Sequence, residues 1–142
     1  MARGKYGEAT LHLTAEAVSD ADAYRRARLA VEIWQEVSYR FTAMKSEPGD
    51  STTALKRLGI ATNGRAQRQT QRGIAHGKAI GRAVALAKDL GNLPPNVCTP
   101  SYLVERARGI VRQGKKLTLK ALGMAEIRKL RMGAFLAVTQ GS

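Results

Sequence analysis

The chain has 142 residues, with 24 lysines and arginines, 11 aspartates and glutamates, and one cysteine. A single cysteine excludes a disulfide-stapled secreted fold and a zinc site built from several thiolates. No apolar run reaches the roughly 18–20 residues of a membrane-spanning helix, and no apolar segment follows the N-terminal basic residues as in a secretory signal. We therefore expect a cytoplasmic protein with no membrane association.

The formal net charge of +13 is unevenly distributed. Residues 1–50 hold 7 basic and 8 acidic side chains, residues 51–88 hold 8 basic and no acidic ones, and residues 89–142 hold 9 basic and 3 acidic ones. The middle stretch could bind nucleic-acid phosphates, with release of counterions. It could equally be a solvated helix face or a surface that meets acidic groups of a partner. The candidate nucleic-acid contacts are Lys56, Arg57, Arg65, Arg68, Arg72, Lys78 and Arg82.

The first half of the chain predicts a strand, a helix and a second short strand. Residues 9–15 alternate, with Leu11 and Leu13 on one face, but no pairing partner is evident. Apolar residues recur at three- and four-residue steps over residues 20–44, which predicts a helix that buries Trp34 and Phe41. Trp34 could instead anchor a partner. A helix break is expected at residues 46–51 and a short strand near residues 58–61.

A second long helix is predicted over residues 66–90. Gly73, Gly77 and Gly81 are spaced four apart and form one seam of small residues. Each glycine in a helix interior costs about 1 kcal/mol relative to alanine. This cost is understandable if another backbone lies close along the seam. The prolines at 94 and 95 follow and form a stiff connector, which is the natural candidate for a domain boundary.

The last third predicts the beginning of an α/β domain. Thr99 as N-cap and Pro100 at the first helical position start a helix that Gly114 ends, with a buried stripe of Leu103, Ala107, Ile110 and Val111. Residues 117–122 (L-T-L-K-A-L) alternate like a strand, and residues 124–130 predict a short helix. Helix, strand and helix in quick succession are typical of an α/β fold.

The titratable residues do not predict a catalytic centre. His12 lacks ligand neighbours and is expected to be a hydrogen-bonded strand histidine, His76 a surface or capping residue, and Cys98 a buried structural thiol rather than a nucleophile. The acids are scattered, so no cluster could hold two cations roughly 3.5–4 Å apart.

Two stretches resemble the leucyl aminopeptidase (cytosol aminopeptidase) family of bacteria. They are A-V-A-L-A-K-D-L-G-N-L-P-P-N-V-C-T-P-S-Y-L at residues 83–103 and E-I-R-K-L-R-M-G-A-F-L-A-V-T-Q-G-S at residues 126–142. Looser similarity extends over residues 9–142. The resemblance implies a helix-rich α/β fragment. Residues 1–65 would end an N-terminal α/β domain, residues 66–95 would form a linker helix and Pro-Pro connector, and residues 96–142 would begin the catalytic domain.

The resemblance also implies an activity. Family members are hexameric cytosolic hydrolases that release N-terminal amino acids, preferably Leu, from peptides. Two divalent metals, manganese or zinc, generate the hydroxide nucleophile and polarise the scissile carbonyl. Their ligands, a Lys, several Asp and a Glu, lie beyond the Q-G-S at residues 140–142. We therefore expect an aminopeptidase fragment that is inactive alone, binds no cofactor, and holds no catalytic, metal or substrate-binding residue.

Two alternatives to the aminopeptidase fragment remain open. The chain could be a basic DNA-binding module, or a purely structural segment that packs within an oligomer. One local detail departs from the family pattern, because Arg131 stands where many relatives have Gly. If this position needs a positive φ, the arginine costs about 1 kcal/mol or more.

Overall fold

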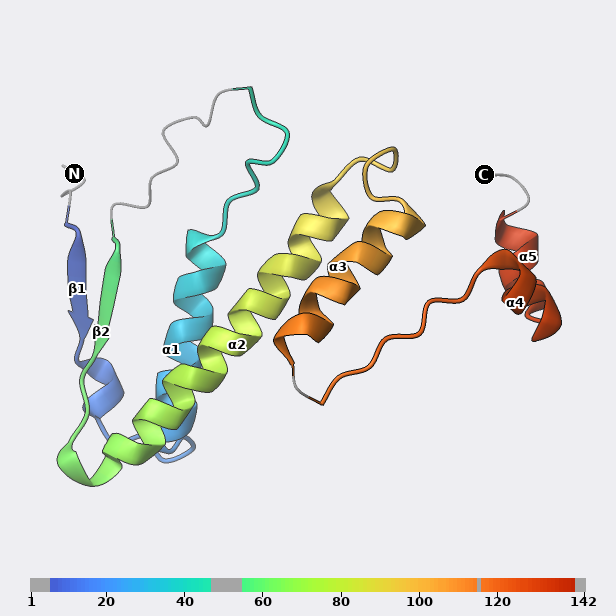
Figure 1. The fold of residues 1–142 in the computed structure, drawn as a ribbon. Coiled ribbons are helices and arrows are strands. Elements are labelled where there is room, and N and C mark those ends of the chain that lie inside the picture. Colours follow the sequence, from blue (N-terminus) through green and yellow to red (C-terminus); the bar gives the residue numbers. More distant parts are fainter. Residues whose placement is uncertain (1–5, 47–54, 115, 140–142) are drawn as a thin grey trace. The chain divides into compact units, whose positions relative to one another are not determined.

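The computed structural model describes residues 6–46, 55–114 and 116–139. The chain divides into two compact units, Met1–Leu93 and Pro94–Ser142. The first unit contains β1 (Glu8–Leu11), η1 (Leu13–Ala15), α1 (Ala23–Ser38), β2 (Arg57–Ile60), η2 (Gly64–Ala66) and α2 (Gln67–Asn92). The second contains α3 (Pro100–Gln113), α4 (Met124–Lys129) and α5 (Gly133–Thr139) (Figure 1). This composition, rich in helix with a small sheet, confirms the predicted α/β class.

A two-stranded parallel sheet lies at the start of the first unit. β1 pairs with β2, and Leu11 stands opposite Ile60 in the register. The strand expected near residues 58–61 is therefore present, shifted by one residue. It is also the partner that the sequence did not identify for the first strand.

The first strand is shorter than the predicted residues 9–15, because the 3-10 helix η1 turns the chain after His12. Thr14 is buried there, and its hydroxyl lies 3.0 Å from the carbonyl oxygen of Leu11 and 2.9 Å from that of Ala61. Leu13 is 73% exposed. The prediction that Leu13 shares a buried face with Leu11 is thus wrong, as is the placement of His12 within a strand.

Helix α1 begins three residues later and ends six residues earlier than predicted. Asp22 is its N-cap and accepts a hydrogen bond from the backbone N–H of Arg25 at 2.8 Å, which satisfies one of the free donors at the helix start. At the other end Tyr39 is extended, with φ −61° and ψ 134°. Phe41 therefore lies outside the helix, and both it and Trp34 are only half-buried.

Helices α1 and α2 lie side by side along the glycine seam (Figure 1). An added Cβ on Gly73 would lie 2.4 Å from the carbonyl oxygen of Tyr24, and one on Gly77 would lie 2.8 Å from that of Arg28. The prediction that a second backbone approaches this seam is confirmed. The close approach leaves little apolar volume to bury, so the apolar core of the described residues consists of Ala23, Ala27 and Val31.

The predicted break at residues 46–51 lies mostly outside the described residues. Among the helices that the structure does describe, none combines the length and the apolar character needed to cross a bilayer.

In the second unit, α3 has the predicted caps. The Thr99 side chain accepts a hydrogen bond from the backbone N–H of Tyr102 at 3.3 Å, and Gly114 is the C-cap. The predicted stripe is less buried than expected, because Leu103 is 44% and Ile110 46% exposed. No layer of the described residues covers this face of α3 completely.

Helix α4 begins as predicted and α5, which the sequence did not indicate, follows it. Between them Arg131 has a φ of 53°. The N–H of Arg131 donates to the carbonyl of Arg128 at 3.0 Å and that of Met132 to the carbonyl of Ile127 at 3.2 Å, the two bonds of a Schellman motif. The position therefore does adopt the left-handed conformation in which glycine is favoured.

The strand predicted at residues 117–122 is absent. These residues form neither helix nor strand, since no strand of the described chain lies alongside them.

Candidate functional site

All seven predicted nucleic-acid contacts have exposed side chains. Arg57 is the first residue of β2, Lys56 directly precedes it, and Arg65 lies in η2. The other four are on α2, and we call Arg68, Arg72, Lys78 and Arg82 the basic face of α2. The structure thus groups four of the seven on one helix and leaves three on preceding elements.

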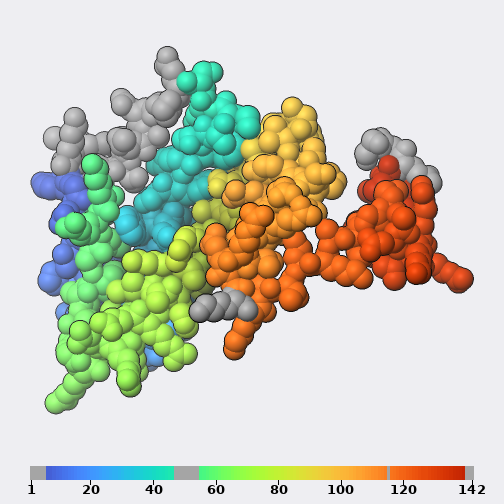
Figure 2. Space-filling model, in the orientation of Figure 1, coloured from blue at the N-terminus to red at the C-terminus, as the bar shows by residue number. Residues whose placement is uncertain are grey.

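Arg68 and Arg82 of the basic face lie on the side of α2 opposite α1, whereas Arg72 reaches toward Tyr24 of α1. Residues nine apart on an α-helix are separated by about 180° around its axis. Arg68 is therefore opposite Gly77 and Arg82 opposite Gly73, the two glycines that contact α1. The side chains along the N-terminal half of α2 reach solvent in Figure 2 (yellow-green). The glycine seam and the basic residues are consequently two sides of the same helix.

Several basic side chains already have partners. Arg57 forms an ion pair with Glu8 at 2.5 Å, and the guanidinium carbon of Arg72 lies 5.8 Å from the ring centroid of Tyr24. Arg68, Lys78 and Arg82 form no ion pair with any carboxylate in the described part of the chain. Within the basic face, these three cations also make no cation–π contact among the described residues.

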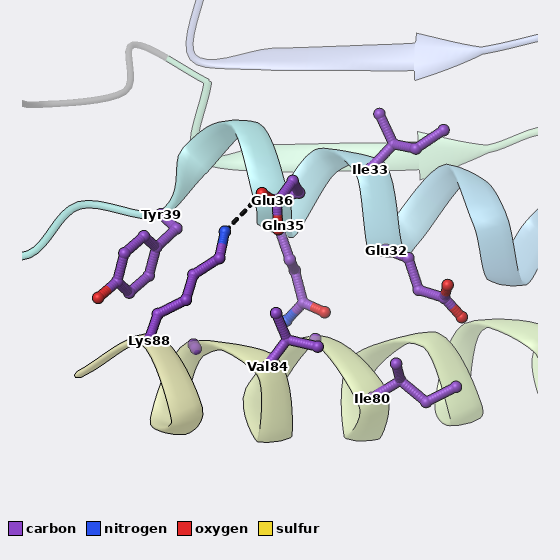
Figure 3. Close-up of a pocket in the computed structure, with 10 residues that line it drawn as sticks. Glu32, Ile33, Gln35, Glu36, Tyr39, Ile80, Val84 and Lys88 are labelled. Atoms are coloured by element: carbon purple, nitrogen blue, oxygen red, sulfur yellow. Dashed lines mark hydrogen bonds and ion pairs between the residues drawn. The ribbon is translucent and has the colours of Figure 1, made fainter. Parts of the chain in front are cut away.

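A second feature is an apolar groove of about 260 Å³ between α1 and the C-terminal half of α2. Its lining includes Ile33 of α1 and Ile80 and Val84 of α2 (Figure 3). An ion pair between Lys88 and Glu36, with a Nζ–Oε1 distance of 2.5 Å, spans the groove toward the helix ends. No pattern in the sequence indicated this groove.

Beyond this ion pair, a polar network closes the ends of the two helices. Tyr39 donates a hydrogen bond to Asp89 at 2.9 Å, and the Asn92 amide donates to the Tyr39 hydroxyl at 3.2 Å. The Lys88 Nζ lies 5.0 Å from the Tyr39 ring centroid. Desolvation, together with the Asp89 carboxylate, raises the pKa of Tyr39, while Asn92 and Lys88 act in the opposite direction. About 50 residues separate Tyr39 from its partners, so no local sequence pattern could reveal this network.

The side chains that could act as nucleophiles or metal ligands do not lie close together in the described part of the chain. His76 is exposed and its Nδ1 lies 3.0 Å from the Tyr24 hydroxyl, while His12 is exposed and Cys98 is half-buried. In the described ranges no three His, Cys, Asp or Glu side chains gather where they could hold a metal ion.

Comparison with known proteins shows which protein family this chain resembles. Residues 85–142 match the model of the cytosol aminopeptidase family, catalytic domain. The chain is 39% identical over 97% of its length to a probable cytosol aminopeptidase of Paraburkholderia phymatum, and 42% identical over 96% to one of Alkalilimnicola ehrlichii. It is 39% identical over 95% of its length to the cytosol aminopeptidase of Pseudomonas aeruginosa.

The chain is similar to members of the cytosol aminopeptidase family over nearly all of its length. It spans 27–28% of the length of these three relatives. The segment that matches the catalytic domain begins within α2 and includes all of α3, α4 and α5.

The resemblance to cytosol aminopeptidases implies a pair of divalent metals. The carboxylates in the described part of this chain do not fit such a pair. Glu32 is held by Arg28 at 3.2 Å and Glu36 by Lys88, while Asp89 accepts the Tyr39 hydrogen bond. Glu105 pairs with Arg108 within α3. Each of these acids is engaged by a different donor in a different place, so they do not form a common oxygen cage.

Proposed function

We propose that this chain forms part of a leucyl aminopeptidase that releases N-terminal amino acids from peptides in the cytoplasm. Residues 1–65 would belong to its N-terminal domain, residues 66–95 to the linker helix and Pro-Pro connector, and residues 96–142 to the start of the catalytic domain. The match of residues 85–142 to the catalytic domain of the family is the observation that supports this proposal most directly. We further propose that the complete enzyme is a homo-hexamer.

We also propose that the 142 residues alone do not catalyse hydrolysis. The two metal ions, manganese or zinc, would be held by residues of the relatives that this chain does not span. Support comes from the scattered carboxylates described above, which are occupied by arginine, lysine and tyrosine partners. In this view the chain supplies scaffold rather than ligands.

Two measurements test this proposal. Hydrolysis of leucine p-nitroanilide by the purified chain with added Mn²⁺ should not exceed the buffer rate, with the cytosol aminopeptidase of P. aeruginosa as the positive control. Titration calorimetry should show no stoichiometric uptake of two Mn²⁺ ions. Turnover together with uptake of two ions would contradict the proposal that the metal site lies elsewhere.

DNA binding is a second candidate function because Arg68, Lys78 and Arg82 of the basic face of α2 have neither an ion pair nor a cation–π contact in the described part of the chain. The same residues could alternatively remain solvated or meet an acidic protein surface. If all three contact phosphates, affinity for a duplex should fall roughly 40-fold between 50 and 200 mM salt. Fluorescence anisotropy with a labelled duplex measures this dependence, and an affinity that does not change with salt would remove this candidate.

A further inference from the structure

The apolar lining of the groove between α1 and α2 belongs to a longer ridge on α2. Residues four apart form such a ridge along a helix. Ile80 and Val84 line the groove, and the same ridge begins with Arg72 and His76 (Figure 3). The helical rise from His76 to Val84 is about 12 Å. The ridge therefore carries a basic and an imidazole side chain at its N-terminal end and apolar side chains further along.

A matching ridge on α1 faces it. The Tyr24 hydroxyl, near the start of α1, lies 3.0 Å from His76 Nδ1, and the two rings meet edge to face with centroids 5.6 Å apart. Further along α1, Glu36 is paired with Lys88 of α2. The apolar lining lies between these two contacts, so the polar groups around Tyr24 stand at one end of the groove and Lys88 stands at the other.

The end of the groove near Tyr24 is cationic. The guanidinium carbons of Arg28 and Arg72 lie 5.9 and 5.8 Å from the Tyr24 ring centroid. Arg28 is paired with Glu32 at 3.2 Å, whereas Arg72 forms no ion pair with a carboxylate in the described residues. A neutral His76 that accepts the Tyr24 hydrogen bond carries its proton on Nε2 and so offers a further donor. Guanidinium and imidazole donors side by side suit a carboxylate.

We propose that this groove binds an aliphatic monocarboxylate, such as a medium-chain fatty acid. The carboxylate would lie at Arg72 and His76, and the hydrocarbon tail would cover Ile80 and Val84, which are 38% and 41% exposed. Burial of this apolar surface would drive binding. Such binding is separate from peptide hydrolysis and does not depend on the proposed aminopeptidase function.

Charge complementarity favours this ligand over other occupants. The two carboxylates that line the groove, Glu32 and Glu36, are already paired with Arg28 and Lys88, so they leave no free acid for an apolar amine. A neutral apolar ligand would not pair with Arg72. A second copy of this chain would bring another net charge of +13 against the first.

Titration calorimetry with alkyl ions tests the proposal on the native 142-residue chain. Octanoate should bind one to one with a dissociation constant of about 1 mM or tighter. Hexanoate should bind about tenfold more weakly, because each buried CH₂ group contributes about fourfold. Octylammonium has the same tail and the opposite charge, and should bind about tenfold or more weakly than octanoate. Equal affinity for octanoate and octylammonium would overturn the proposal.

Two variants of the charged end separate a local contact from overall charge. Arg72→Gln should weaken octanoate binding by about fivefold or more, because it removes the cation that faces the carboxylate. Arg82→Gln removes the same charge on the side of α2 opposite Gly73, and should weaken binding by less than about twofold. Equal losses would show that net charge attracts octanoate and would overturn the proposal.

The apolar end has its own matched pair of variants. Ile80→Gln should weaken octanoate binding by about fivefold or more. Ile110→Gln changes a comparably exposed isoleucine on α3, 46% exposed, and should weaken binding by less than about twofold. Circular dichroism shows whether each variant keeps its helix content, and the comparison of octanoate with hexanoate needs no variant. Equal losses from the two isoleucine variants would overturn the proposed position of the tail.

NMR spectra and light scattering identify what occupies the groove. Amide shifts caused by octanoate should be confined to α1 and α2, and shifts spread equally over α3, α4 and α5 would overturn the proposal. A dimer that Ile80→Gln dissociates would assign the groove to a second copy. Absence of octanoate binding to the folded monomer would leave the groove to another protein surface. Either result would overturn the proposal.

Discussion

The hydroxyl of Tyr39 lies 2.9 Å from the Asp89 carboxylate and joins the end of α1 to the last turn of α2. Tyr39 is the first residue after α1, so the bond fixes the chain where the helix stops. The apolar core between the two helices is built from small side chains, Ala23, Ala27 and Val31. The hydrogen bonds at the helix ends therefore contribute a larger share of the stability of this helix pair than they would beside a large apolar core.

The Tyr39–Asp89 bond should make stability depend on alkaline pH. The pKa of Tyr39 is raised above its usual value of 10.0 in the folded protein. A raised pKa means that the contribution is complete below the unfolded value and is lost as pH rises through the folded value. Tyr39→Phe should lower the unfolding temperature at pH 8, and this difference from the native chain should shrink above pH 10.

Circular dichroism at 222 nm measures both unfolding temperatures. Tyr6→Phe is the matched control, because Tyr6 is 74% exposed and its loss should leave the temperature unchanged at either pH. A Tyr39→Phe protein as stable as the native chain at pH 8 would show that the bond contributes nothing.

The helices were largely predictable because their signals are local. Thr99 and Gly114 mark the ends of α3 in the sequence as they do in the structure. The glycine spacing in α2 predicted a close backbone neighbour without naming it, and α1 is that neighbour. Arg131 is a similar case, since its departure from the family's glycine indicated a position at which φ would matter.

Features that depend on distant residues could not be predicted in the same way. The alternation at residues 117–122 gives a strand only when another strand pairs with it, and the described chain contains none there. Helix α1 ends at Ser38, and the next residue, Tyr39, bonds to Asp89, far along the chain. The basic residues were visible in the sequence, but their division between one face of α2 and the preceding elements required the three-dimensional structure.

Gly77→Ala should destabilise the first unit. The added Cβ would lie 2.8 Å from the backbone oxygen of Arg28 and 2.9 Å from the Cβ of Val31, so α1 and α2 would have to move apart. Alanine improves helix propensity by about 1 kcal/mol, but overpacking costs about 1–3 kcal/mol. We expect a net loss of about 1 kcal/mol in the free energy of unfolding, measured by urea denaturation.

Gly91→Ala is the matched control for this substitution. It lies on the same helix, and nothing is within 4 Å of the position that its Cβ would occupy. The same change should there be neutral or stabilising by up to about 1 kcal/mol. If both variants shifted stability in the same direction, the contact along the seam would not be the cause.

Arg131→Gly should stabilise the end of α4. A non-glycine residue at φ 53° bears a cost of about 1 kcal/mol, which glycine avoids. Arg131→Ala removes the same side chain but keeps this cost, so it separates backbone strain from the loss of charge. Amide exchange at Leu130 and Met132 should be slower in the glycine variant than in the alanine variant by about fivefold. Equal exchange in the two variants would show that the left-handed conformation carries no cost here.

Two double variants separate the effect of the basic face of α2 on DNA binding from the effect of the protein's overall charge. Arg68→Gln with Arg82→Gln removes two cations that have no acidic partner among the described residues, and should reduce the slope of log affinity for duplex DNA against log salt by about 2. Arg57→Gln with Arg108→Gln removes the same charge from residues already paired with Glu8 and Glu105, and should change the slope by less than half as much. Equal changes would mean that the overall charge attracts the DNA and that the face opposite the glycine seam has no special part in binding.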